Sequence, residues 1–392
     1  MSKTTNLQKK AIEVLKEVHK VYQGNGIVEF FVAGVVSQSS IFLQSSHGKG
    51  KSLLSESIAK IIGASYQRVQ GTPALSESQF IGRYNIPSLL KDKEIVEWRN
   101  FLKAKVKFFD EINRVPPQTL SALHTVLAEK KAIYGNEEIS LTPFIFIAAA
   151  NPADAGCFDM YGPILDRFDM SIFLPTPTFG LKHKILAIQK YQPKQILGQG
   201  EIDNIWAEVE AMPITDAVKN LAFMSIRDLQ ICDHGDKENL IGFPSCCKEC
   251  PFQEGVCAKV DNKSTVSERA YISALRVAKG LAYLRDKSEP EPQELFDVLP
   301  LTLAHRINIL PAAYPGIFTK QEAIENLVDD LQKRITERKD GVLLKIAQYN
   351  RTIDRGARQA IRKTIEDACE NKDLLGAEMF ADTLEEHKNR RG

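Results

Sequence analysis

The chain has 392 residues, a formal net charge of +1 and 43% hydrophobic residues. This length accommodates two or three domains of roughly 100–200 residues each, and the near-zero charge excludes a general attraction to nucleic acid or membrane surfaces. No run of about 18 apolar residues is present, which excludes an apolar membrane-spanning helix. The polar start of the chain lacks the apolar core of a signal peptide, so we expect a cytoplasmic protein.

The first half of the chain alternates predicted helices and strands. Helical spacing of apolar residues predicts a helix over 6–22, and the apolar segment 27–36 predicts a second, short one. Buried strands are predicted at 40–44, 67–69, 106–109, 145–149 and 170–173, helices at 52–62 and 117–129, and a hairpin around the Gly-Asn pair at 130–142. This alternation favours an α/β fold: a doubly wound parallel sheet with helices on both faces.

The pattern changes after a linker rich in proline near 175–193. Helices are predicted downstream at 181–191, 202–211, 214–230, 266–285, 292–306 and 320–385. A cysteine-rich segment, 231–262, interrupts this helical run. The last 70 or so residues carry charges of mixed sign, which is typical of solvated helices.

A phosphate-binding loop is predicted directly after the first strand. The residues Ser45, Ser46, His47, Gly48, Lys49, Gly50, Lys51 and Ser52 match the P-loop pattern except that Ser45 replaces its first glycine. Small residues let backbone N–H groups surround phosphates, Lys51 supplies positive charge, and Ser52 offers a hydroxyl to Mg²⁺. The alternative is a glycine-rich turn with a chance lysine, which the strand–loop–helix context disfavours.

Two carboxylates end the predicted strand at 106–109. In a P-loop fold, Asp110 would bind Mg²⁺ and Glu111 would polarise the attacking water. The alternative is a pair of solvated acids at a strand end, which the upstream phosphate loop disfavours.

From Ser46 onward the chain resembles the MoxR-type AAA+ ATPases. The resemblance rests on an ordered set of motifs over roughly residues 10–310: Arg68–Leu75, Asp110–Thr119, Ala148–Pro152, Leu165–Phe168, Val266–Ala270 and Ala304–Ile307. Gly71 departs from it, because this position usually holds an aromatic residue. The resemblance implies an ATP hydrolase with an α/β nucleotide-binding domain, a helical lid and a homo-hexameric ring.

The resemblance also implies three residue roles. Asn151 would be the sensor that orients the attacking water, Arg167 the arginine finger that reaches the neighbouring subunit's γ-phosphate, and Arg269 the second sensor that closes the lid on the nucleotide. The position of Asn151 at the end of a buried strand agrees with its implied role. The planar guanidinium of Arg167 is suited to stabilising the negative charge on a phosphoryl group. The alternatives are an ion pair of Arg167 with Asp166 or Asp169 in the same subunit, and a plain surface arginine at 269.

Five of the seven cysteines gather in the segment 231–262, which breaks the family pattern. Cys232, Cys246, Cys247, Cys250 and Cys257, with His234, are candidate ligands of a structural Zn²⁺ or of an iron–sulfur cluster. Zinc is favoured, and a group of buried free cysteines is the third possibility. Cys157 and Cys369 are interpreted as ordinary packing residues.

These observations lead to three predicted parts: an AAA+ nucleotide-binding α/β domain at 1–178, a helical lid domain at 179–310 with the insert at 231–262, and a C-terminal helical extension at 311–392. The leading hypothesis is an ATPase that uses ATP and Mg²⁺ to remodel or activate a protein client, with a von Willebrand factor A domain protein as the partner that the resemblance implies. One alternative is a motor acting on nucleic acid, which the balanced charges of 320–392 disfavour. Another is a scaffold that binds ATP and barely hydrolyses it, which Glu111, Asn151 and Arg167 together disfavour.

Overall fold

The computed structural model describes residues 5–22, 26–152, 157–158, 160, 162–176, 191–227, 229, 259–260, 266–310, 313–334, 349, 352 and 354–370. Its centre is a five-stranded parallel sheet in the order β2-β5-β8-β1-β9. The strands are β1 (Ile41–Gln44), β2 (Tyr66–Gln70), β5 (Val106–Asp110), β8 (Ile145–Ala150) and β9 (Met170–Phe173). The predicted α/β class and all five predicted strands are confirmed.

Alternating side chains on these strands build two separate cores. Leu43, Phe108 and Ile147 point to one face, where they pack with α1 (Asn6–Val21), α2 (Ile27–Val36) and α3 (Lys51–Ile61). The neighbouring residues Phe42, Phe109 and Phe146 belong to the other core. That core also contains residues of α4 (Glu77–Phe80), α6 (Asn100–Lys103), α7 (Pro117–Leu120), α8 (Leu123–Ala128) and α9 (Gly162–Leu165). The period of two that defines a strand therefore produces a sheet covered on both faces.

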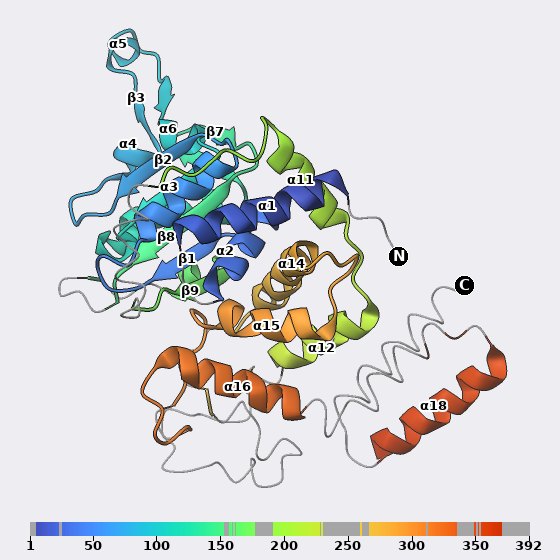
Figure 1. Ribbon diagram of the computed structural model, residues 1–392. Coiled ribbons are helices and arrows are strands. Elements are labelled where there is room, and N and C mark those ends of the chain that lie inside the picture. Colours follow the sequence, from blue (N-terminus) through green and yellow to red (C-terminus); the bar gives the residue numbers. More distant parts are fainter. Residues whose placement is uncertain are drawn as a thin grey trace.

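Two hairpins interrupt the alternation of strands and helices. The first consists of β3 (Gly82–Tyr84) and β4 (Val96–Trp98) with α5 (Ile86–Leu89) at its tip, and it projects from the α/β part (Figure 1). It was not predicted. The second, β6 (Lys131–Tyr134) with β7 (Glu137–Ser140), confirms the hairpin predicted at 130–142. Tyr84 and Tyr134 join the two hairpins through ring contact at 5.5 Å.

The prediction of one continuous helix at 117–129 is wrong. The segment forms two short helices, α7 and α8, separated at Ser121 and Ala122. The Ser121 hydroxyl donates to the Gln118 carbonyl at 2.6 Å, a local bond that competes with the helical backbone pattern.

The described chain after β9 is mainly helical, as predicted, but Thr352 and Asp354 are not helical, so the run predicted at 320–385 is not one continuous helix. The helices are α11 (Glu201–Ala211), α12 (Asp216–Arg227), α14 (Glu268–Leu284), α15 (Pro292–Leu303), α16 (Lys320–Arg334) and α18 (Arg355–Glu370). Residues of α12, α14, α15 and α16 share a third core, while α14 also packs on α2 of the α/β part (Figure 1). The helix predicted at 181–191 lies almost entirely outside the described residues. Within the described ranges, no helix is long and apolar enough to cross a bilayer.

Candidate active site

The predicted phosphate loop connects β1 to α3 at the carboxyl edge of the sheet. Gly48 and Gly50 have left-handed backbone angles, with φ of 73° and 85°, which glycine adopts without steric cost. Gly50 is also the N-cap of α3, so the positive end of that helix faces the loop. The loop therefore has the backbone geometry that curls N–H groups around an anion.

Lys51 lies inside this loop. Its Nζ donates to the carbonyl oxygens of Ser45 at 2.7 Å and Ser46 at 3.2 Å. Burial lowers the pKa of Lys51, and the negative charges of Asp110 and Glu111 oppose that effect. The lysine is thus held close to the acidic pair by loop carbonyls that a phosphate group would replace as partners.

The remaining loop residues surround Lys51. His47 Nδ1 lies 4.0 Å from Glu111 Oε1, and Lys49 Nζ donates to the Thr176 hydroxyl at 2.7 Å. The Ser52 hydroxyl donates to Asp110 Oδ2 at 3.2 Å. The structure therefore brings together the two oxygen groups predicted to bind Mg²⁺.

Asp110 and Glu111 are each contacted by a side chain from β2. Arg68 Nη2 lies 2.6 Å from Asp110 Oδ2, and Gln70 Nε2 donates to Glu111 Oε2 at 2.7 Å. Arg68 also donates to Gln70 Oε1 at 2.6 Å, so the two β2 residues act as one unit. Sequence reasoning found Arg68 and Gln70 only as part of the motif Arg68–Leu75, because residues two apart on an edge strand meet these acids only when β2 pairs with β5.

The backbone at Glu111 is left-handed, with φ of 50°, an uncommon conformation for a residue other than glycine. Gly71 packs directly against it: a Cβ atom at residue 71 would lie 2.2 Å from the Glu111 carbonyl oxygen. The Gly71 N–H also donates to the Asp110 carbonyl at 2.7 Å. This close approach explains why glycine occupies the position where the resemblance leads one to expect an aromatic residue.

Asn151 directly follows β8, which lies between the acid-bearing strand β5 and the loop-bearing strand β1. It is buried, and Asn113 Nδ2 donates to its backbone carbonyl at 3.0 Å. The sheet order therefore places Asn151 at the same edge as Lys51, Asp110 and Glu111. Sequence reasoning did not single out Asn113.

Arg167 and Arg269 lie at the opposite, amino edge of the sheet. The carbonyl of Arg167 accepts a bond from the hydroxyl of Ser40, the residue before β1, at 3.1 Å. Arg269 Nη1 lies 3.4 Å from Asp166 Oδ2. Strand β1 is four residues long, which at about 3.3 Å per residue separates the two edges by roughly 10–13 Å. The structure therefore does not bring Arg269 to the phosphate loop of its own chain.

The two arginines share a neighbour on α8. Burial, and then the positive charges of Arg167 and Arg269, lower the pKa of His124. Arg167 Nη1 donates to the Pro163 carbonyl at 2.5 Å. Both carboxylates considered as intrasubunit partners of Arg167 are engaged by other arginines: Asp166 by Arg306 and Arg269, and Asp169 by Arg276.

Arg306 anchors this edge to the lid. It is 2% exposed, and its Nε donates to Asp166 Oδ1 at 3.1 Å. Its Nη2 donates to the carbonyl oxygens of Asp166 at 3.0 Å and Phe168 at 2.7 Å. Sequence reasoning found Arg306 only as part of a lid motif, because its partners lie about 140 positions away.

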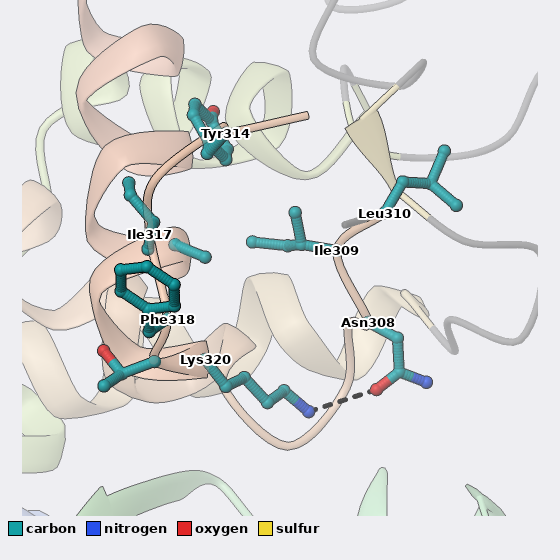
Figure 2. A pocket seen from close by; sticks show the side chains of 9 residues that line it. Asn308, Ile309, Leu310, Tyr314, Ile317, Phe318 and Lys320 are labelled. Atoms are coloured by element: carbon teal, nitrogen blue, oxygen red, sulfur yellow. Dashed lines mark hydrogen bonds between the residues drawn. The ribbon is translucent and has the colours of Figure 1, made fainter. Parts of the chain in front are cut away.

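The lid carries a separate hollow of about 270 Å³, shown in Figure 2. It lies between residues 308–310 and the start of α16, with Ile309, Ile317 and Phe318 among its walls and a bond from Lys320 Nζ to Asn308 Oδ1 at 3.2 Å. None of the predicted phosphate-binding or acidic residues lines it, so it is not part of the candidate site.

The predicted metal ligands have two different outcomes. Ser52 and Asp110 lie within hydrogen-bond distance of each other, which fits a shared Mg²⁺. Cys232, His234, Cys246, Cys247, Cys250 and Cys257 lie outside the described residues. Among the residues that the structure does describe, no group of three or more His, Cys, Asp or Glu could hold a metal. Cys157 is a free, half-buried thiol, and the Cys369 side chain is not described.

Comparison with known proteins agrees with this geometry. The family described as AAA domain (dynein-related subfamily) matches residues 40–168, and the AAA lid domain matches residues 258–327. The chain is 26% identical over 305 residues to Chaperone MoxR1 of Mycobacterium tuberculosis, covering 74% of each protein. It is 21% identical over 313 residues to Protein MoxR of Methylorubrum extorquens, covering 76% of this chain and 87% of that one.

A solved structure supports the fold. A protein from Cytophaga hutchinsonii superposes with a TM-score of 0.66 at 24% identity, covering 82% of this chain and 94% of that chain. The segments with the phosphate loop and the lid thus match AAA families in the same order as the motifs, and the two relatives from Mycobacterium tuberculosis and Methylorubrum extorquens carry MoxR names. From its fold, its ordered motifs and these relatives, we conclude that the chain belongs to the MoxR-type family of AAA+ ATPases.

Proposed function

We propose that this ATPase hydrolyses Mg-ATP between the subunits of a homo-hexameric ring and uses the energy to remodel a protein client. One observation carries the proposal: the phosphate loop and acids lie at one edge of the sheet, and two arginines lie at the other. A single chain cannot bring these halves together across β1. Two neighbouring copies can bring them together when the amino edge of one packs against the carboxyl edge of the other. In a closed ring every site then contains a phosphate loop with its acids and a pair of arginines.

Each residue has a role in this proposal. The loop N–H groups and Lys51 hold the phosphates, and Asn151 with Glu111 orients the attacking water. Ser52 and Asp110 would hold Mg²⁺, which supplies positive charge beside the phosphates when bound. Arg167 and Arg269 of the adjacent subunit stabilise the negative charge that develops on the transferred phosphoryl group.

For Mg²⁺ to bind, Asp110 must exchange its contact with Arg68. For Glu111 to reach water, its carboxylate must leave Gln70. The β2 pair therefore holds both acids in an arrangement that precedes catalysis. Catalytic hydrogen bonds often tighten only when the substrate binds, so these contacts are compatible with the proposed roles.

The proposal of a protein client is supported by the relatives, and the proposal of a partner rests on the resemblance to MoxR-type ATPases. One of them is named a chaperone, which supports a protein substrate. We propose a von Willebrand factor A domain protein as the partner. We also propose that the chain divides at about residues 178 and 310 into nucleotide-binding, lid and C-terminal parts, and that it acts in the cytoplasm.

We further propose that the cysteines of 231–262 bind one Zn²⁺, with an iron–sulfur cluster as the alternative. Thiolates must be deprotonated to bind, so acidification should release the metal. Elemental analysis of anaerobically purified protein should find about one zinc per chain, and finding neither zinc nor iron would refute the proposal.

The catalytic assignment is tested with two variants. Glu111→Gln should keep ATP binding and nearly abolish turnover, because the phosphate loop is intact while the carboxylate is lost. Lys51→Ala should lose binding itself. Glu56→Gln, an exposed acid on α3 paired with Lys60, is the control and should behave as the parent. Parental turnover by Glu111→Gln would show that another residue orients the water.

A further inference from the structure

Asn113 occupies the short 3-10 turn Ile112–Arg114 that follows the acidic pair. Its side chain is 5% exposed, and its Nδ2 donates to the carbonyl of Asn151 at 3.0 Å. One buried amide thus joins the residue proposed to sense the γ-phosphate to the turn that begins at Glu111.

This bond lies where the strand ladder has ended. The pairing of β5 with β8 runs from Val106 opposite Ile145 to Phe109 opposite Ala148. Beyond that point the two chain segments diverge, and Asn113 spans the gap between them. The backbone carbonyl of Asn113 also accepts a bond from the N–H of Phe158 at 2.8 Å. Asn113 therefore holds both the residue directly after β8 and part of the segment that follows it.

The amide oxygen of Asn113, Oδ1, shows which of the two polar atoms of this side chain contributes to the site. Oδ1 is buried and has no hydrogen-bond partner among the residues that the structure describes. Exchanging the amide oxygen and nitrogen would place two oxygen atoms together at the Asn151 carbonyl, so the network supports the orientation described. Asn113 lines a cavity of about 320 Å³ whose walls are mostly apolar, among them Phe42, Phe158 and Leu165, with Gln44, His305 and Lys320 as polar members. A buried acceptor without a partner destabilises a fold, and an apolar side chain beside these walls would avoid that cost. The contribution of Asn113 therefore lies in the bond that it donates.

We propose that Asn113 is a positioning residue for ATP hydrolysis. By holding the Asn151 carbonyl, it fixes the peptide plane from which the Asn151 side chain extends, relative to Glu111 two residues before Asn113. The inference rests on the proposed roles of Glu111 and Asn151. It assigns Asn113 no contact with ATP, so the loss of its bond should affect the chemical step and leave nucleotide binding unchanged.

Two variants and one control test the proposed positioning role of Asn113. Asn113→Leu removes the donor and keeps the size of the side chain, while Asn113→Asp keeps the shape and replaces the donor with a carboxylate. The control is Asn326→Asp, the same exchange at a half-buried residue of α16 far from the acids. We expect kcat to fall about 10- to 100-fold in both Asn113 variants, because small misplacements of catalytic groups have effects of this size. The KM for ATP should stay within about twofold of the parent.

A pH profile separates positioning from a merely structural role. Burial and the nearby Glu111 carboxylate should raise the pKa of the new carboxyl in Asn113→Asp, and its protonated form can again donate to Asn151. His305 and Lys320 line the same cavity. His305 stays neutral because burial lowers its pKa well below the ordinary value, whereas the positive charge of Lys320, whose pKa burial also lowers, opposes part of the rise in the carboxyl pKa. The rate of Asn113→Asp relative to the parent should therefore recover between pH 8 and pH 6, while Asn113→Leu should show no recovery.

Three results would overturn the inference: parental kcat in Asn113→Leu, a raised KM with unchanged kcat, or equal losses in both variants without recovery at low pH. If Asn113→Leu does not fold, the profile of Asn113→Asp decides alone. Failure of the proposed function gives a different result, since Glu111→Gln would then retain turnover whatever the Asn113 variants do.

Discussion

The two edges of the central sheet are built differently. At the carboxyl edge, Asp110 and Glu111 are held by Arg68 and Gln70. Asp110 is 6% exposed, but the side chain of Arg68 is 46% exposed. At the amino edge, both partners are buried: Arg306 is 2% exposed, Asp166 is 7% exposed, and two hydrogen bonds link them. Solvent-exposed ion pairs contribute little stability, whereas breaking a buried pair is costly.

This difference matches what each edge has to do. Partners at the carboxyl edge must be exchanged whenever nucleotide and metal bind, so weak contacts suit it. The amino edge must present Arg167 and Arg269 at a constant position to another subunit, so a buried framework suits it. Asp169 illustrates that framework: burial alone would raise its pKa, but Arg276, Ser40 and Ser273 together lower it.

The largest expected effect comes from breaking the contribution of the amino edge to a neighbouring site. Arg167→Ala should lower turnover by about 10³-fold or more, the usual range for an arginine finger, and Arg269→Ala should lower it less. Mixing either variant with Lys51→Ala subunits should restore part of the activity, because some interfaces then pair an intact loop with intact arginines. The recovery is measured as the ATPase rate at several ratios of the two variants.

The same mixing experiment distinguishes the two possible sites of action of Arg269. If Arg269 served the nucleotide of its own chain, no mixture of Arg269→Ala with Lys51→Ala would contain a complete site. Absence of recovery, with mixed rings verified, would therefore contradict the placement at the subunit boundary.

The second effect concerns the stability of the amino edge. Arg306→Met should lower the free energy of unfolding by about 3–5 kcal/mol, because it leaves the buried Asp166 carboxylate without its main partner. Arg276→Met also removes a partner of a buried carboxylate, Asp169, but this arginine is 44% exposed and Ser40 and Ser273 still donate hydrogen bonds to Asp169. The loss should therefore be smaller, roughly 1–2 kcal/mol. The free energies of unfolding of both variants can be compared by denaturant titration. Equal losses of stability would show that Arg306 does not hold the amino edge.

A third effect concerns Lys107, which is fully buried in β5 just before the acids. Burial, and then the charges of Lys105 and Lys130, lower its pKa to about 7. Between pH 7 and about pH 10 the unfolded chain binds more protons at this group, so the stability it contributes rises with pH, by up to about 1.4 kcal/mol per pH unit. That stability is lost as pH falls toward 7.

Lys107→Met should therefore stabilise the protein by roughly 1–3 kcal/mol at pH 7 and flatten the dependence on pH between 7 and 9. Lys103→Met, at an exposed position of α6, is the control. Unfolding curves at several pH values measure both. An unchanged slope in Lys107→Met would show that another group titrates.

The smallest expected effect concerns the Mg²⁺ requirement of the carboxyl edge. Arg68→Ala should free Asp110 and lower the Mg²⁺ concentration for half-maximal ATPase activity by about two- to fivefold, as expected for an exposed pair worth up to about 1 kcal/mol. Arg83→Ala, which breaks an exposed pair with Glu97 on the projecting hairpin, should have no effect. A higher Mg²⁺ requirement in Arg68→Ala would mean that Arg68 supports the site.

Most of the carboxyl edge could be predicted because its signals are local. The strand before the loop, the glycines, Lys51, and the acids after the next strand each carry a short-range pattern of burial or chemistry. The β3–β4 hairpin could not be predicted, because its three-residue strands are too short to establish a period of two. The break between α7 and α8 depends on one serine hydroxyl, which composition does not reveal.

The sequence alone determined the class of fold, the phosphate loop and the acidic pair, because periodicity and motif chemistry act over a few residues. Only the tertiary structure decided which groups meet. Strand order brings Asn151 beside Asp110, the pairing of β2 with β5 brings Arg68 and Gln70 to the acids, and lid packing carries Arg269 to Asp166. These contacts join residues up to about a hundred positions apart, so they follow from how buried surfaces stack and not from any local pattern.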